Sequence, residues 1–168
     1  MTTQPFLRAD RIAIAVGAGG ACLLLGALGF QYLGGIAPCE MCHWQRWAHI
    51  AAALVGIVGG ATVKRESTAR TLAWTAIVCV LVSGLIGAYQ TGTEYHFLPG
   101  PAACTGHRYI LGSNMPPPEV QCDVVTWSLF GLSMATYNAL CSFLIVALGA
   151  FALSKKSTPS REWQNSAA

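Results

Sequence analysis

Hydrophobic residues fill four long segments of the chain, and these segments carry almost no charge. Each approaches or exceeds the roughly 20 apolar residues that a helix needs to cross the hydrocarbon core of a bilayer. The second segment has only 17 uncharged residues between Arg46 and Lys64. Because this is only about 25 Å of helix, the helix must begin upstream of Arg46. The pattern predicts membrane-spanning helices at about residues 12–33, 43–63, 71–91 and 125–153.

The spacing of these segments predicts an all-α membrane protein, a four-transmembrane-helix bundle that forms a single membrane domain over residues 1–168. A short loop covers about residues 34–42, and one long loop covers about residues 92–124. A polar tail at residues 154–168 follows the last helix. Glycines are frequent in the first two spans, where they allow helix backbones to approach closely.

Charged residues make up only 10% of the chain, against about 25% in a soluble domain. Eight of the ten Lys and Arg residues form three clusters beside the predicted spans: Arg8 and Arg11; Lys64, Arg65 and Arg70; Lys155, Lys156 and Arg161. Because positive residues favour the cytoplasmic side, both termini and the loop between the second and third spans are expected in the cytoplasm. The clusters do not alternate with aromatic residues, which argues against nucleic-acid binding. A cleaved signal peptide is the alternative for the first span, but its long apolar run favours a retained helix.

Four cysteines lie in the two loops on the opposite, periplasmic side. Cys39 and Cys42 form a C-x-x-C pair, and Cys104 and Cys122 stand in the long loop. The periplasm of bacteria is oxidising, so disulfides form and persist there. Two thiol pairs at one face of a bilayer suggest thiol–disulfide exchange coupled to an electron acceptor dissolved in the membrane. Four cysteines allow three connectivities, and the simplest joins Cys39 to Cys42 and Cys104 to Cys122.

Metal binding and structural roles are the alternatives for the cysteines and histidines. Zinc sites share the C-x-x-C spacing, but four thiolates would have to converge at an oxidising surface. Haem ligation by His49 lacks a second histidine on another span. The remaining cysteines lie within apolar spans and are expected to act as small hydrophobic side chains; they are Cys22, Cys79 and Cys141.

Cys42 is the cysteine that the sequence predicts to be reactive. The upstream extension of the second helix places Cys42 near the helix start, four residues before Arg46. A helix N-terminus and a nearby cation both favour a thiolate. Positions 42, 46 and 49 are spaced i, i+4 and i+7, so Cys42, Arg46 and His49 share one helix face.

The long loop contains many prolines and glycines, and we expect it to be irregular. Cys104 and Cys122 are expected to be exposed there, where an external protein can reach them. A loop of this length can also fold back over the C-x-x-C pair. Residues 109–111 are expected along the membrane surface, and the prolines at 116–118 should form a short, stiff extended piece. The tail after Ser154 is expected to be disordered.

Three segments of the sequence match known signatures. Residues 38–46 read PCEMCHWQR, residues 99–106 read PGPAACTG, and residues 122–138 begin with Cys-Asp and end in WSLFGLSMATYN. The first resembles the P-C-x-x-C-x-x-Q-R motif of the DsbB family, the bacterial inner-membrane thiol–quinone oxidoreductases. The second is similar to that family's approach to its first loop cysteine, and the third to its C-D…W-x-x-F-G-L-S-x-A-x-x-N segment. The resemblance covers essentially the whole bundle, in order.

The resemblance implies an enzyme that reoxidises a periplasmic, thioredoxin-like dithiol oxidase of the DsbA type and passes the electrons to a membrane quinone. Cys104 would be attacked by the partner's thiolate, with Cys122 as its resolving mate. The electrons would pass to Cys39 and Cys42, and Cys42 would deliver them to ubiquinone or menaquinone. A paralogue dedicated to one oxidase, or a scaffold whose disulfides only staple its loops, are the alternatives.

The resemblance also points to the quinone site, with one departure. Many family members carry H-x-G-x-E at the end of the third span, where this chain reads QTGTE from Gln90 to Glu94. Gln90 can donate a hydrogen bond to a quinone oxygen but cannot carry a proton. His49 or His96 is therefore expected to substitute as the proton carrier. The predicted quinone-binding residues are Gln45, Arg46, His49 and Gln90.

Overall fold

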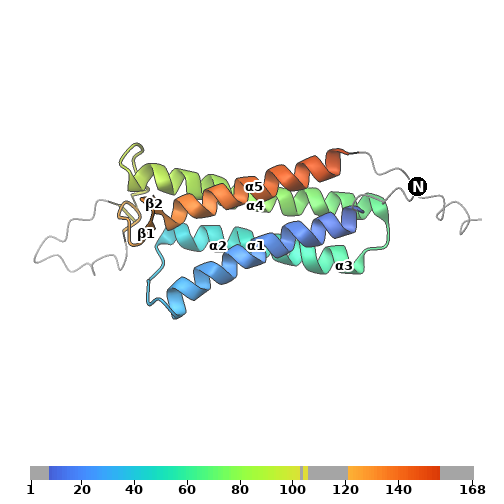
Figure 1. The fold of residues 1–168 in the computed structure, drawn as a ribbon, viewed down its shortest axis with the longest axis horizontal. Coiled ribbons are helices and arrows are strands. Elements are labelled where there is room, and N and C mark those ends of the chain that lie inside the picture. Colours follow the sequence, from blue (N-terminus) through green and yellow to red (C-terminus); the bar gives the residue numbers. More distant parts are fainter. Residues whose placement is uncertain (1–7, 103, 106–120, 156–168) are drawn as a thin grey trace, which may run out of the picture.

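Four helical segments lie side by side in the computed structural model, which describes residues 8–102, 104–105 and 121–155 (Figure 1). The elements in chain order are α1 (Ala9–Tyr32), α2 (Glu40–Ala53), the π-helix η1 (Leu54–Gly59), α3 (Gly60–Thr62), α4 (Glu66–Glu94), β1 (Ser128–Leu129), β2 (Leu132–Ser133) and α5 (Met134–Ser154). The predicted four-helix bundle is confirmed. The predictions for residues 109–111, for the prolines at 116–118 and for most of the tail lie outside the described residues.

The second helical segment consists of α2, η1 and α3 in direct succession. It begins at Glu40, upstream of Arg46, as its short apolar stretch requires. Among the described residues, only α1, α4 and α5 are individually long and apolar enough to cross a membrane. The second segment approaches that length only through its three pieces together. The π-helical turn η1 lies where this segment packs closely against α1. Single π-helical turns occur inside α-helices, frequently at functional sites.

Glycines provide the close contact between α1 and η1. A Cβ atom at Gly56 would lie 2.5 Å from the Ala13 carbonyl oxygen, and one at Gly17 would lie 2.9 Å from the Gly56 Cα. The core around this contact is built mainly of small residues, and Ala13, Ala73 and Ala76 are fully buried. Small residues at the interface are typical of membrane helices, which associate by close packing.

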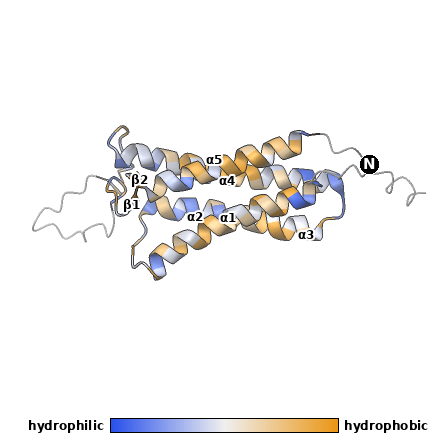
Figure 2. Ribbon diagram, viewed as in Figure 1, coloured by the Kyte–Doolittle hydropathy of each residue, from blue (hydrophilic) through white to orange (hydrophobic). Residues whose placement is uncertain are grey.

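Large apolar side chains face outward along the bundle. Leu25, Leu54, Leu144 and Leu148 are each more than half exposed, and Figure 2 shows hydrophobic residues along much of the length of α1, α4 and α5. Such a surface is unfavourable in water, whereas in lipid it is the expected exterior. The outer surface therefore agrees with the predicted membrane location.

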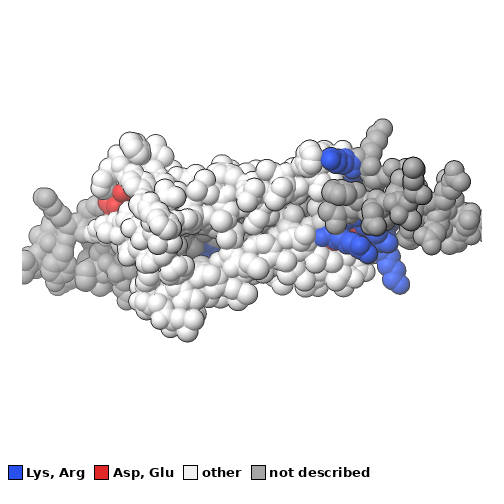
Figure 3. Space-filling view, in the orientation of Figure 1, with Lys and Arg blue, Asp and Glu red and all other residues white. Residues whose placement is uncertain are grey.

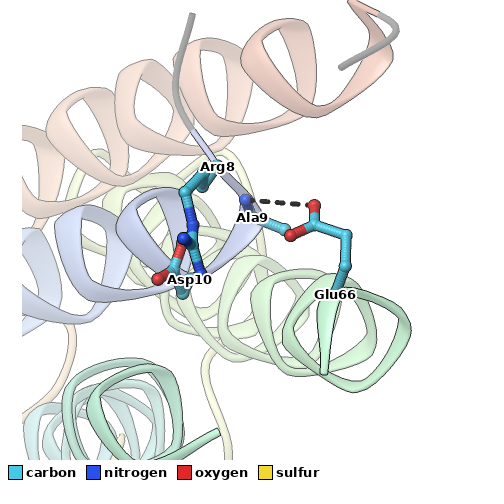
Figure 4. A network of polar contacts seen from close by, with 4 residues as sticks. All are labelled: Arg8, Ala9, Asp10 and Glu66. Carbon is cyan, nitrogen blue, oxygen red and sulfur yellow. Dashed lines mark hydrogen bonds and ion pairs between the residues drawn. The ribbon is translucent and has the colours of Figure 1, made fainter. Parts of the chain in front are cut away.

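Most of the basic residues gather at one end of the molecule. Figure 3 shows most of the visible Lys and Arg at this end and acidic residues at the opposite end. At the basic end, Glu66 accepts a hydrogen bond of 3.4 Å from the backbone N–H of Ala9, and Arg8 forms an ion pair of 3.2 Å with Asp10 (Figure 4). Glu66 and Asp10 lie in the first turns of α4 and α1, where the helix dipole favours a carboxylate.

The start of the last helix differs from the prediction. The apolar run was expected to be helical from about residue 125, but α5 begins at Met134. The intervening residues form an antiparallel hairpin that pairs Ser128 with Ser133, and its turn places Phe130 and Gly131 at positive φ. The Ser133 hydroxyl then accepts a hydrogen bond from the Thr136 N–H and caps α5. An apolar run alone does not separate a short hairpin from the first turns of a helix.

The glycine contact gives a stability prediction. Gly56→Ala should destabilise the protein by roughly 1–3 kcal/mol, because the added methyl group meets backbone that has to move. Gly29→Ala is the matched control, since nothing lies within 4 Å of a Cβ atom at that helical position. Unfolding of both variants in mixed detergent micelles measures the difference. Equal stability of the two variants would contradict the close contact.

Candidate functional site

Both thiol pairs lie at the end of the bundle opposite the basic clusters, which we call the thiol end. Cys104 and Cys122 form a disulfide with a Cα–Cα distance of 5.4 Å, so the structure selects the simplest pairing for the loop cysteines. Cys39 and Cys42 are free thiols whose sulfur atoms lie 2.8 Å apart. The disulfide, Cys39 and Met41 form one buried cluster, against which Cys42 packs. The two redox pairs are therefore neighbours in space.

The predicted exposure of the loop cysteines is wrong. Cys104 is 3% exposed and Cys122 is fully buried, because the disulfide packs against the C-x-x-C segment. The Cys122 N–H donates a hydrogen bond of 2.8 Å to the Cys104 carbonyl, and the Thr93 hydroxyl donates one of 3.3 Å to the Cys122 carbonyl. The described residues at the two sides of this disulfide thus lie against the C-x-x-C pair, and a partner has to gain access to the disulfide before exchange.

Hydrogen bonding places the negative charge of the C-x-x-C pair on Cys42. Cys39 caps α2, and its sulfur accepts a hydrogen bond of 3.3 Å from the Cys42 N–H. The Cys39 thiol beside the Cys42 sulfur lowers the pKa of Cys42 to about 6, with help from the Cys39 backbone, Gln90 and Arg46 and against the effect of burial. The pKa of Cys39 is raised by the same sulfur–sulfur contact and by burial. Both residues lie outside the predicted span at 43–63.

Arg46 is held against α1 by its guanidinium. Its Nη1 atom donates a hydrogen bond to Gln31 Oε1, and its Nη2 atom donates one of 3.2 Å to the Ala27 carbonyl. Its Nε atom is buried and has no partner among the described residues. No carboxylate pairs with Arg46 in the described part of the chain. Arg46 therefore supplies a fixed positive charge near Cys42.

Buried polar side chains form a chain of hydrogen bonds through the middle of the thiol end. Gln45 Nε2 donates to Gln90 Oε1 at 2.7 Å, and Gln90 Nε2 donates to Glu94 Oε1 at 3.0 Å. On the other side, Asn138 Nδ2 donates to Gln45 Oε1 at 2.7 Å, and Asn138 Oδ1 lies 2.9 Å from His49 Nε2. Gln90 Nε2 also lies 3.4 Å from the Cys39 sulfur. This chain connects the thiol pair with the interior of the bundle.

A cavity of about 190 Å³ adjoins these groups. Its polar wall includes Cys42, Arg46, His49, Gln90 and Asn138. Its aromatic wall comes from three different segments: Phe30, Trp127 and Tyr137. The ring centroids of Phe30 and Trp127 lie 4.8 Å apart, and those of Trp127 and Tyr137 lie 6.3 Å apart. Because drug-sized ligands occupy about 300–1,000 Å³, this cavity suits one ring rather than a whole large ligand.

All four predicted quinone-binding residues line this cavity, but they contribute differently. Arg46 and His49 each keep one buried nitrogen without a partner among the described residues. The amides of Gln45 and Gln90 are bonded to each other, so they shape the wall. His96, the other expected proton carrier, is exposed in the segment after α4 and does not line the cavity.

Sequence reasoning missed Asn138, Glu94 and Ser83 as parts of the site. Glu94 is 8% exposed, and Ser83 is fully buried. Ser83 Oγ lies 2.9 Å from His49 Nε2. The sequence did carry a signal for these three residues, because a polar or ionisable side chain within a membrane helix is unfavourable unless it has a function or a partner. Two redox pairs beside a polar cavity in an apolar bundle define a membrane-embedded thiol oxidoreductase.

Comparison with known proteins agrees with this class. The model of the family "Disulfide bond formation protein DsbB" matches residues 9–152. The chain is 26% identical to disulfide bond formation protein B of Aromatoleum aromaticum over 78% of this chain and 86% of that protein. It is 29% identical to disulfide bond formation protein B of Azoarcus sp. (strain BH72), over 76% of this chain and 81% of that protein. It is 30% identical to disulfide bond formation protein B 2 of Pseudomonas aeruginosa (strain PAO1), over 81% of this chain and 86% of that protein. No solved structure matches the chain.

The chain belongs to the DsbB family. Members of this family are multi-pass proteins of the inner membrane and thiol–quinone oxidoreductases, and the chain carries both of the thiol pairs that this reaction uses. The functional class predicted from the sequence is therefore confirmed.

The charge distribution in the C-x-x-C pair gives a pH prediction. In the reduced protein, alkylation of Cys42 should rise with pH and reach half its limiting rate near pH 6, because only the thiolate reacts. Cys39 should stay unreactive over the same range. Cys39→Ala should raise the pKa of Cys42 more than Arg46→Met does, since the Cys39 thiol is the larger cause of the shift. Peptide-resolved mass spectrometry measures both rates, and a Cys42 midpoint near 9 would contradict this electrostatic picture.

Proposed function

We propose that the two thiol pairs form one electron path from a periplasmic DsbA-like oxidase to a quinone in the cavity. The observation that carries this proposal is the buried cluster in which the Cys104–Cys122 disulfide packs against the C-x-x-C pair. In this arrangement, the thiol end faces the periplasm and both termini face the cytoplasm, in a single membrane domain. The position of Cys42 in the wall of the cavity, with the Cys39 sulfur 2.8 Å from its own, argues against a scaffold that uses these cysteines only as staples.

The first exchange takes place at the loop disulfide. A thiolate of the reduced partner attacks the Cys104 sulfur, which forms a mixed disulfide and releases Cys122 as a thiolate. The partner's second thiol then displaces Cys104, so the partner leaves oxidised and the loop pair becomes a dithiol. A second exchange reduces the Cys39–Cys42 disulfide and restores the loop disulfide.

The redox potential of the partner explains the need for a quinone. A DsbA-like partner has a potential near −120 mV, which is already strongly oxidising for a disulfide. Each ~30 mV of further driving force contributes about 1.4 kcal/mol for two electrons. Ordinary disulfides offer no large margin beyond this partner, so a more oxidising acceptor has to take the electrons. A bound quinone, either ubiquinone or menaquinone, supplies that chemistry by accepting two electrons and two protons.

The cavity residues fit such a ring. The Cys42 thiolate lies in the cavity wall and is the electron donor. Arg46 stabilises negative charge that develops on a ring oxygen, because a fixed cation in a site of low dielectric acts more strongly than water does. The hydrogen bonds from Arg46 to Gln31 and Ala27 keep that cation in place. Phe30, Trp127 and Tyr137 form an aromatic wall that would hold the apolar ring of a bound quinone.

The loop disulfide gives the first functional prediction. Cys104→Ser should abolish oxidation of the reduced partner, because the sulfur that the partner attacks is missing, while quinone binding stays intact. Cys79→Ser is the matched control, since Cys79 packs against the apolar core and should not affect turnover. Oxidation of a purified thioredoxin-like dithiol with either quinone measures the effect. Full turnover by Cys104→Ser would refute the proposed order of electron flow.

Arg46 gives the second functional prediction. Arg46→Met should raise the quinone concentration needed for half-maximal turnover by roughly ten- to hundredfold, because a hydrogen bond to a charged group is worth about 1.5–3 kcal/mol. Arg46→Lys keeps the charge but loses the planar fork, so it should retain part of the activity. Exchange between the partner and the loop disulfide should remain in both variants. If wild type, Lys and Met variants behave equally, Arg46 is only an anchor at the membrane boundary.

A further inference from the structure

The hairpin of β1 and β2 supplies part of the cavity wall, although it is too short to hold its own shape. Trp127 directly precedes β1 and lines the cavity. The two strands pair only Ser128 with Ser133 and Leu129 with Leu132. An isolated two-stranded hairpin is marginally stable at best. The position of Trp127 therefore depends on the contacts that the hairpin makes with the rest of the bundle.

The turn of the hairpin adds to this need for support. Its central residues, Phe130 and Gly131, have φ values of 51° and 78°, as in a type I′ turn. Asparagine, aspartate and glycine are preferred at the first of these positions, because bulky side chains are unfavourable at positive φ. Phe130 is 91% exposed, so packing against the protein does not offset this strain. Another contact has to hold the backbone of the turn.

Two tyrosine hydroxyls provide that contact from the neighbouring helices. The Tyr95 hydroxyl donates a hydrogen bond of 2.6 Å to the Gly131 carbonyl. The Tyr137 hydroxyl donates one of 3.0 Å to the Leu129 carbonyl. Tyr95 directly follows α4, Tyr137 lies near the start of α5, and the hairpin lies at the end of the bundle where these two helices meet it (Figure 1). The backbone on both sides of Phe130 is thus tied to a helix.

The two tyrosines differ in their relation to the cavity. Tyr137 lines the cavity, and its ring centroid lies 6.3 Å from that of Trp127. Tyr95 lies outside the cavity wall, so a change at its hydroxyl reaches a bound ring only through the hairpin. On the other side, Trp127 packs against Phe30 of α1, with ring centroids 4.8 Å apart. The hairpin therefore carries one aromatic wall residue across to α1, and Tyr95 holds the hairpin from α4.

We propose that Tyr95 is a positioning residue for the quinone, because its hydroxyl holds the hairpin so that Trp127 stays in the cavity wall beside Phe30. The inference rests on the proposed quinone site. It gives Tyr95 no contact with the quinone and no part in the electron transfer from Cys42. Loss of the hydroxyl should therefore weaken quinone binding and leave the reaction of the bound quinone unchanged.

The first experiment measures the KM for quinone and kcat separately. Tyr95→Phe removes only the hydroxyl, so it should raise this KM roughly two- to tenfold, as expected for the loss of one neutral hydrogen bond, while kcat changes little. Tyr89→Phe is the matched control. Tyr89 is 39% exposed, against 38% for Tyr95, and its hydroxyl also donates a hydrogen bond of 2.6 Å, to the Pro99 carbonyl. Because that carbonyl lies outside the hairpin, Tyr89→Phe should keep the wild-type KM for quinone.

The second experiment observes Trp127 in the absence of quinone. Fluorine-19 NMR of protein labelled with fluorotryptophan, in lipid nanodiscs, reports the environment of each tryptophan, and Trp127→Phe identifies the Trp127 signal by its loss. This signal should be single in the wild type. Tyr95→Phe should broaden it or add a second signal, because the hairpin then leaves its place part of the time. Tyr89→Phe should leave the Trp127 signal unchanged.

A change at the turn tests whether the hairpin is the connection between Tyr95 and the cavity. Phe130→Asn gives the turn the sequence that type I′ turns favour most. Combined with Tyr95→Phe, it should bring the KM for quinone back toward the wild-type value and restore a single Trp127 signal. A role of Tyr95 only as an aromatic side chain at the membrane boundary would not respond to a substitution in the turn.

The results separate the role of Tyr95 from the quinone site itself. A wild-type KM or an unchanged Trp127 signal in Tyr95→Phe, an equal rise of the KM in Tyr89→Phe, or no recovery with Phe130→Asn would each overturn the inference. Arg46→Met tests the quinone site independently of the hairpin. A raised KM in Arg46→Met together with a wild-type KM in Tyr95→Phe would leave the quinone site in place and remove Tyr95 from its support.

Discussion

The hydrogen bond between Gln45 and Gln90 joins α2 to α4 where the two thiol pairs meet, and much of the site depends on it. An amide in a membrane helix finds no water, so each of these side chains has to satisfy its donors and acceptors within the protein. Pairing the two amides fixes the distance between Cys42 on α2 and the Gln90 nitrogen on α4. One turn further along α4, Thr93 holds the backbone of the loop disulfide. The same helix contact thereby positions both redox pairs.

The site separates its charges instead of pairing them. Arg46 lies on α2 and is bonded only to neutral groups of α1, whereas Glu94 lies on α4 and accepts from Gln90. A carboxylate paired directly with Arg46 would offset the positive charge of its guanidinium. Holding them apart with neutral hydrogen-bond partners keeps a positive charge near the Cys42 thiolate and a carboxyl group at the far end of the amide chain. Preorganised charge of this kind stabilises charge that develops during a reaction.

The sequence was sufficient to predict features that depend on local spacing. Apolar run length and basic clusters predicted the four-helix bundle. The i, i+4, i+7 spacing predicted that Cys42, Arg46 and His49 share one helix face, and all three line the cavity. Features that depend on contacts between distant segments were missed or wrong. The burial of Cys104 and Cys122 follows from packing against Met41, and the role of Asn138 follows from a partner 93 residues away in the chain. The hairpin before α5 was missed because its residues are as apolar as a helix turn.

Gln90, which stands where the sequence resemblance leads us to expect a histidine, has a structural consequence of its own. A histidine ring has two nitrogen atoms and can serve two partners. The Gln90 amide serves three kinds of partner at once: its oxygen accepts from Gln45, and its nitrogen faces both Glu94 and the sulfur atoms of Cys39 and Cys42. An amide has two N–H groups and a carbonyl, so one side chain can meet all of these partners at once. Gln90 thereby joins the carboxyl group of Glu94 and the thiol pair to the amide of Gln45 on the neighbouring helix.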